Sequence, residues 1–235
     1  MARFFSSGAI EFGPWSPSKA GVLKECPLKY IFQYVEKPQL TEENSIVQDD
    51  SALVMGSAVH KYAENLAEGQ SNREAEEDAF VEVPKTKKNL LTIRSQKRGI
   101  HDFVERMNTF SSNNKVILDE TELRLAVSEN LKQVDFWDYS SVLRGVLDRL
   151  LIIEKNGAKH AIAIDIKTGK RRPVTEYMLQ LESYGILVHS AYDVKTVSMA
   201  AYFSSSGDLD WYERRVSKKD INEENPVFTT INGLI

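Results

Sequence analysis

The sequence of 235 residues contains a single cysteine, Cys26. One cysteine cannot form a disulfide within the chain, which favours a reducing compartment. It also excludes a zinc or iron–sulfur site held by four cysteines of this chain. No apolar run is long enough to cross a bilayer, and the first residues lack the apolar core of a secretion signal. We therefore expect a cytoplasmic protein without membrane contact.

The sequence has little net charge, −4 at pH 7, and this sum alone argues against a polyanionic partner such as a nucleic acid. The positions of the charged residues along the chain are more informative than the sum. One basic cluster lies within residues 84–101, where no acid occurs: Lys85, Lys87, Lys88, Arg94, Lys97 and Arg98. A second cluster follows an apolar segment: Lys167, Lys170, Arg171 and Arg172. A charge run is usually a solvated face, whereas two basic clusters flanking an acidic site would favour a track for phosphates.

Hydrophobic periodicity changes from helical to strand-like along the chain, and there are no internal repeats. The expected helices are 16–26 (with Ser16 as N-cap), 56–69, 71–82, 95–110 and 173–192. The expected strands are 116–127, 142–153, 160–167, 195–203 and 209–216, followed by a short polar tail. This order predicts an α/β fold with a mixed central sheet.

One strand ends on an acid followed by a lysine, in the segment Ala161-Ile-Ala-Ile-Asp165-Ile-Lys167. A carboxylate in apolar surroundings must be paired, hydrogen-bonded or bound to metal. Lys167 lies two residues on and so points to the same side as Asp165. A simple ion pair is the alternative, and the same spacing recurs in Asp193-Val-Lys195, outside an apolar strand.

The preceding strand carries a second acid, Asp148, in an equally apolar context. Carboxylates on two adjacent strands can converge on one hard cation, which makes a metal site the stronger hypothesis. Pairing of Asp148 with Arg144 or Arg149 is the alternative.

Five short motifs in one order resemble the RecB-type branch of the PD-(D/E)XK nucleases, which includes helicase-associated, CRISPR-associated and phage exonucleases. They are Ser16-Pro-Ser18 followed by Cys26-Pro-Leu-Lys-Tyr30, Gly56-Ser-Ala-Val-His60, Gly145-Val-Leu-Asp148, Asp165-Ile-Lys167 and Gln180-Leu-Glu-Ser-Tyr184. Together they cover residues 16 to about 190. The resemblance implies a restriction-endonuclease-like αβββαβ core with an N-terminal helical embellishment. It also implies one domain over 1–235, with a mainly helical part at 1–112 that includes a DNA-threading arch, and a catalytic sheet at 113–218.

The resemblance also implies roles for single residues. His60, Asp148, Asp165 and the Ile166 carbonyl would bind Mg²⁺ or Mn²⁺. Lys167 would orient the attacking water, and Gln180 and Tyr184 would contact the substrate backbone or brace Lys167. An iron–sulfur cluster is not expected, because three of the four cysteines that hold it in some relatives are missing. The expected DNA contacts are both basic clusters together with Ser16, Ser18, Lys29, Tyr30 and Arg149.

The function that follows is a metal-dependent deoxyribonuclease, more an exonuclease than an endonuclease, of DNA replication, recombination or repair. Its substrate would be single-stranded DNA or DNA with a single-stranded end, and its partners would include a helicase or recombination protein. A bacterial or phage source would suit it. Two alternatives remain: a non-catalytic subunit that binds DNA ends or single strands with the same fold, and an unrelated α/β protein whose strand acids form structural ion pairs.

Overall fold

A mixed sheet forms the centre of the computed structural model, which describes residues 4–11, 13–36 and 51–233. The strands are β1 (Lys115–Ser128), β2 (Gln133–Val134), β3 (Ser141–Lys155), β4 (Ala158–Lys167), β5 (Thr196–Phe203) and β6 (Asp208–Trp211). Their order across the sheet is β2–β1–β3–β4–β5–β6. Only β4 and β5 run parallel, and the other pairs are antiparallel. The predicted α/β fold with a mixed sheet is therefore confirmed.

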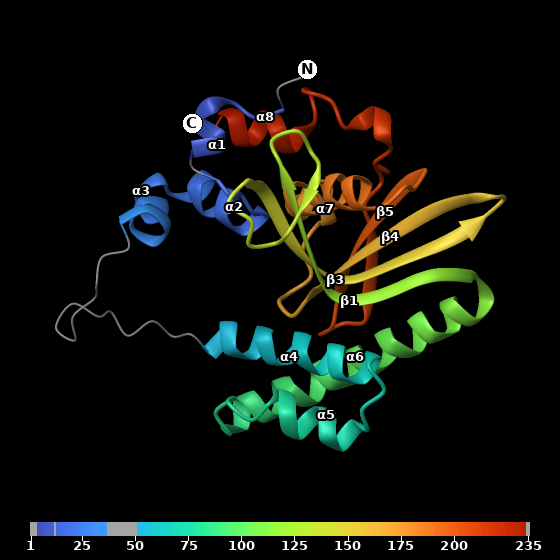
Figure 1. Ribbon diagram of the computed structural model, residues 1–235. Helices are drawn as coiled ribbons and strands as arrows, with labels where there is room; N and C mark the ends of the chain where they lie inside the picture. Colours follow the sequence, from blue (N-terminus) through green and yellow to red (C-terminus); the bar gives the residue numbers. More distant parts are fainter. Residues whose placement is uncertain (1–3, 12, 37–50, 234–235) are drawn as a thin grey trace.

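Helices cover both faces of the sheet (Figure 1). The N-terminal helices are α1 (Ser7–Glu11), α2 (Pro17–Glu25) and α3 (Pro27–Tyr30), with the π-helical turn η1 (Ile31–Glu36). They are followed by α4 (Ser51–Ala67), α5 (Asn72–Ala79) and α6 (Lys87–Asn113). The last helices are η2 (Val174–Tyr177), α7 (Met178–Ala191), η3 (Lys218–Asp220) and α8 (Pro226–Gly233). In Figure 1, α7, α8, α1 and α2 lie above the sheet and α4–α6 below it.

The crossover helix α7 connects the two parallel strands, a connection that requires a long crossover. Its buried Leu181 and Leu187 belong to a cluster that also contains Trp15 and Leu143. At Gly185 a Cβ would lie 2.8 Å from the side chain of Val216, so only glycine permits this close approach. Packing against α7 therefore fixes the side of the sheet on which the C-terminal segment lies.

The helices α4–α6 pack on the opposite face through a second cluster that includes Tyr62, Ile100 and Tyr202. Helix α6 lies directly on the sheet, because a Cβ at Gly99 would fall 1.8 Å from the carbonyl oxygen of Ser204. The Tyr202 hydroxyl donates a hydrogen bond of 2.6 Å to the Gly99 carbonyl. This helical layer is thus held firmly against the strands that carry the candidate site.

Strands β3 and β4 separate at one end of the sheet. Their pairing runs from Lys155 opposite Ala158 to Arg149 opposite Ile164 and ends there within these two described strands. Beyond this point the backbone of Trp15 takes the place beside β3, accepting a hydrogen bond of 2.8 Å from the Arg144 amide. A fork therefore opens between the two strands that carry the predicted acids.

The fork coincides with an irregularity in side-chain direction. Leu147 and Leu150 both belong to the cluster beneath α7, although strict alternation along a strand would place them on opposite faces. On the neighbouring β1, Glu122 has a φ of +48°, in the left-handed region that residues other than glycine rarely adopt. The pairing of β1 with β3 keeps the same register on both sides of this point, so the side chains are redirected without an inserted residue. Here Glu122 and Asp148 lie at the irregularity.

Several expectations about element boundaries need correction. Helices α4 and α6 begin at Ser51 and Lys87 rather than at residues 56 and 95. Strand β6 ends at Trp211, and Val216 joins the sheet only through an isolated bridge to Val197. The residues after Val216 are not simply a polar tail, because they include α8, whose Phe228 is fully buried. Among the described residues, no helix combines the length and apolar character needed to span a membrane.

Candidate active site

Asp148 bridges the two strands of the fork. Its Oδ2 accepts a hydrogen bond of 2.5 Å from the Ile166 amide of β4, where regular strand pairing has already ended. Its Oδ1 lies 3.1 Å from Nδ1 of His60, which comes from α4. The side chain is 9% exposed. One buried carboxylate thus connects the sheet to the helical layer at the point predicted from the sequence.

His60, Glu122 and Asp148 form a compact group of potential metal ligands. One ligand atom from each lies within 4.8 Å of the others. Glu122 Oε1 is 3.8 Å from His60 Nδ1. An imidazole nitrogen with two carboxylates suits a divalent cation such as Mn²⁺ or Mg²⁺. The side chains present therefore fit the metal that the sequence predicts, although Glu122 was not among the expected ligands.

The protonation of this group responds to its surroundings. Burial alone would lower the pKa of His60, but the hydrogen bonds of Asp148 and Glu122 and the charges of Asp148 and Asp165 outweigh it and raise the pKa to about 10. Burial, together with the charge of Asp165, raises the pKa of Asp148 to about 6. A protonated imidazole thus neutralises the acids, and a metal bound by His60 must displace that proton.

A second polar group links Asp165 and Lys167 to α7. Lys167 Nζ lies 2.7 Å from Asp165 Oδ2 and donates to Gln180 Oε1 at 2.7 Å. Gln180 Nε2 donates to the Tyr184 hydroxyl at 2.8 Å, and that hydroxyl donates to Asp165 Oδ1 at 2.9 Å. Four predicted residues therefore form one closed ring of contacts. Burial and the charges of Asp165 and Asp148 raise the pKa of Tyr184, so its hydroxyl remains a donor.

Tyr177 completes the surroundings of Lys167, since the ammonium lies 4.5 Å from the centre of its ring. A cation over an aromatic ring is stabilised while its hydrogen-bond donors stay directed elsewhere. The side chain of Lys167 is 21% exposed. The lysine is therefore fixed in position but still reachable from outside.

Several predicted DNA contacts have other roles in the structure. Ser16 caps α2 by accepting a hydrogen bond from the Lys19 amide. Tyr30 is buried and stacks on Trp15 with ring centres 5.9 Å apart. Arg149 is 8% exposed and its guanidinium contacts Asp119 at 2.6 Å. Burial leaves the Tyr30 ring and the Arg149 guanidinium little surface for a phosphate backbone, and their contacts with DNA stay predictions.

The two basic clusters lie on exposed elements but are partly neutralised. In the first cluster Lys97 pairs with Glu76. The others are exposed, just before α6 or along its first half: Lys85, Lys87, Lys88, Arg94 and Arg98. In the second, Arg171 binds Asp210 and Arg172 binds Glu176, while Lys170 is exposed. Ser18 and Lys29 are also exposed, and Lys29 lies 3.7 Å from Glu25.

A comparison of the sequence with known families gives a match over most of the chain. Residues 14–229, nearly the whole chain, match the PD-(D/E)XK nuclease superfamily. The chain belongs to this superfamily. A search of curated proteins found no match. A PD-(D/E)XK nuclease is a metal-dependent nuclease, and the His60–Glu122–Asp148 group supplies a candidate place for its divalent metal.

The sequence of this PD-(D/E)XK nuclease gives only a weak indication that Glu122 belongs to the metal group. The strand that precedes Asp148 contains three acids, Asp119, Glu120 and Glu122. Only Glu122 reaches His60, because its left-handed backbone turns it toward α4. Asp165 and the Ile166 carbonyl stay predicted ligands. In the structure the two oxygens of Asp165 contact Lys167 and Tyr184.

Proposed function

We propose that this nuclease is a Mg²⁺- or Mn²⁺-dependent deoxyribonuclease of the RecB-type branch and acts as an exonuclease. The observation that supports it most is the position of the His60–Glu122–Asp148 group at the same fork as the Asp165–Lys167 pair. The RecB-type and exonuclease parts of the proposal are supported by the ordered sequence motifs.

Each residue has a defined chemical task in this proposal. His60, Glu122 and Asp148 would hold the metal, with Asp165 beside them. A bound divalent metal lowers the pKa of water and offsets negative charge at a phosphate. Lys167 offers an ammonium held by Asp165 and Gln180, which can orient the attacking water and stabilise charge on the phosphate oxygens. Tyr184 and Gln180 fix the orientation of this pair.

A groove beside the metal group supports access for a nucleic-acid strand. It is lined in part by Gly56, His60, Glu122 and Thr168. Helix α6 reaches the same region, because Gln96 donates a hydrogen bond of 2.9 Å to the Thr168 carbonyl. We propose that the helices α4–α6 form one wall of the substrate path, and the DNA-threading arch expected in this helical part stays a prediction.

The test compares linear with covalently closed circular DNA, both single- and double-stranded, with Mg²⁺, with Mn²⁺ and with a chelator. Linear RNA of the same sequence tests the preference for DNA. We expect release of nucleotides from labelled linear DNA, intact circles, and no reaction with the chelator. Cutting of circles would show an endonuclease. Binding without any cleavage would favour the non-catalytic DNA-binding subunit.

A further inference from the structure

An aromatic loop with two arginines lies on the same sheet surface as the metal group. The loop connects β2 to β3 and carries Phe136, Trp137 and Tyr139. The Trp137 side chain is 67% exposed and Tyr139 is fully exposed. Exposed aromatic rings on a loop contribute little to the hydrophobic core. A group of such rings on one surface therefore indicates contact with a ligand.

Two arginines stack on these rings. The Arg144 guanidinium lies 4.9 Å from the Trp137 ring centre and 5.3 Å from that of Phe136. Arg124 lies 5.9 Å from the Phe136 ring centre. Within the described part of the chain neither guanidinium forms an ion pair. Their charges are therefore available to a ligand, while the rings hold them in place.

The strand geometry places these arginines on the face that carries Asp148. On β1, Leu123 faces α7, so its neighbour Arg124 faces the opposite side of the sheet. On β3, Leu147 faces α7, and Arg144, three residues earlier, faces the opposite side as well. Arg124 is opposite Val146, which lies between Arg144 and Asp148. Four residues of β-strand separate Arg144 from Asp148, or about 13 Å. The metal group, Arg124, Arg144 and the aromatic loop therefore form one continuous surface.

Two acids near this surface, Asp135 and Asp138, have structural roles in the loop. Asp135 accepts a hydrogen bond of 3.0 Å from the Trp137 amide. Asp138 accepts hydrogen bonds of 2.7 Å from the amide and hydroxyl of Ser140. Both carboxylates thus hold the turn that presents Trp137 and Tyr139.

We propose that this surface, which we call the Arg–Trp track, binds the single-stranded DNA that extends from the scissile phosphate. Arg124 and Arg144 contact backbone phosphates, and Trp137 stacks on a base, with Tyr139 beside it. Aromatic stacking together with basic groups is the general way in which proteins bind single strands without reading sequence. The track rests on the proposed function, since it places the strand relative to the metal group.

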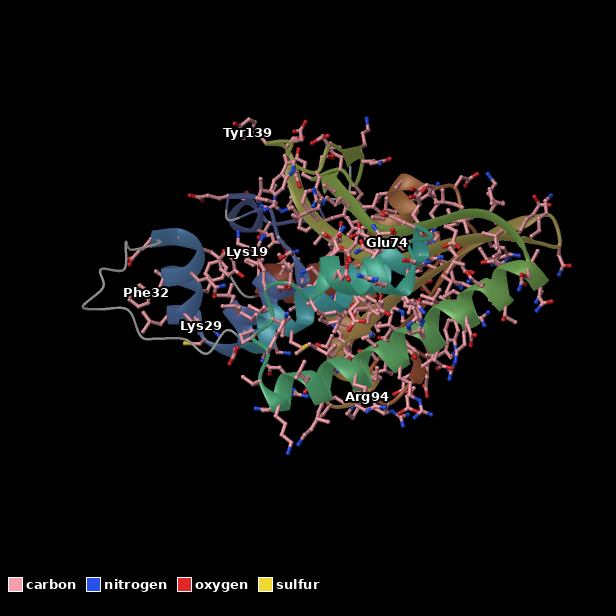
Figure 2. All side chains as sticks on the ribbon, turned by 90° about the horizontal axis from the view of Figure 1, so that it is seen from below. Lys19, Lys29, Phe32, Glu74, Arg94 and Tyr139 are labelled. Carbon is pink, nitrogen blue, oxygen red and sulfur yellow. The ribbon has the colours of Figure 1, made fainter. Side chains whose placement is uncertain are left out.

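The Arg–Trp track is separate from the basic cluster of α6. Figure 2 shows Tyr139 and Arg94 at opposite margins of the molecule. The two surfaces can therefore be tested by separate substitutions.

The experiment measures the Kd for a labelled single-stranded DNA 20-mer. A chelator is present, so that cleavage does not interfere with binding. The proteins compared are wild type, Trp137→Ala and the double variant Arg124→Ala/Arg144→Ala. Trp211→Ala and Arg215→Ala are matched controls, because Trp211 lies on β6 at the far side of the sheet and is 49% exposed. We expect Trp137→Ala to raise the Kd about 5- to 150-fold. The double variant should reduce the slope of log Kd against log salt by about 1.4. The controls should bind like wild type.

Cleavage assays with Mg²⁺ separate failure of the track from failure of the proposed function. Trp137→Ala should raise KM for the 20-mer and leave kcat unchanged, with a melting temperature like that of Trp211→Ala. If wild type cleaves DNA but Trp137→Ala binds it as tightly as wild type, the track is wrong and the nuclease function stands. If wild type cleaves nothing but Trp137→Ala still weakens binding, the nuclease function is wrong, and the surface binds single strands without a scissile phosphate. If Trp137→Ala binds DNA like wild type but no longer binds a protein partner, the proposed track is also wrong.

Discussion

Replacement of Glu122 by glutamine removes one negative charge from the metal group and preserves the size of the side chain. The ligand atoms of this group lie within 4.8 Å of one another. A cation held by these atoms would lie within that distance of Glu122, where two unit charges attract by at least about 3.5 kcal/mol if the effective dielectric constant is about 20. The Glu122 side chain is 33% exposed, so screening reduces the effect to about 2 kcal/mol. We therefore expect Glu122→Gln to weaken Mn²⁺ binding about 30-fold.

Isothermal titration calorimetry with Mn²⁺ measures this change directly. The matched control is Glu120→Gln, two residues away on β1, because the charge of Glu120 acts on Tyr192 at the end of α7 instead of on His60. Glu120→Gln should bind Mn²⁺ like wild type, and circular dichroism should show both variants folded. If Glu122→Gln binds Mn²⁺ as tightly as wild type, Glu122 is not a metal ligand and the proposed metal group is wrong.

Three further predictions follow from the site and the packing. Because the pKa of His60 is raised to about 10 and that of Asp148 to about 6, Mn²⁺ should release about one proton between pH 6 and 10, and its affinity should fall as pH falls. Calorimetry in buffers of different ionisation enthalpy counts these protons, and a pH-independent affinity would contradict the ligand role of His60. Tyr184→Phe removes the hydroxyl that contacts Asp165 and Gln180, so the cleavage rate should fall about 10-fold, and the loss of a donor to the buried Asp165 should lower stability by about 1–3 kcal/mol; an unchanged rate would exclude a positioning role. Gly99→Ala places a Cβ against the Ser204 carbonyl and should lower stability in urea by about 1–3 kcal/mol, whereas Gly21→Ala, with open space around it, should not destabilise.

The central sheet and α7 could be predicted from the sequence because their apolar residues repeat with a clear period. The start of α6 was missed for a physical reason. Leu90 and Leu91 are exposed, 52% and 61%, so the first turns of this helix carry no regular apolar stripe. Helix α8 was missed because its buried Val227 and Phe228 follow a polar stretch and form only a short pattern.

The core of the site was also accessible from sequence, since Asp148, Asp165 and Lys167 are polar residues in apolar strands. Their convergence with His60 depends on the fork and on the packing of α4, which no local pattern encodes. Glu122 depends on a single left-handed residue in β1. The sequence also offered a false candidate, Asp193 with Lys195. The Lys195 amide donates to the Lys159 carbonyl, at the opposite end of β4 from Lys167.

The false candidate provides the most direct control for the central claim, which is that Lys167 acts at the catalytic centre of a metal-dependent nuclease. The measurement is the initial rate of Mg²⁺-dependent cleavage of end-labelled linear DNA by Lys167→Ala and by Lys195→Ala. We predict a loss of about 10²-fold or more for Lys167→Ala and a wild-type rate for Lys195→Ala. Cleavage by folded Lys167→Ala at the wild-type rate would contradict the account.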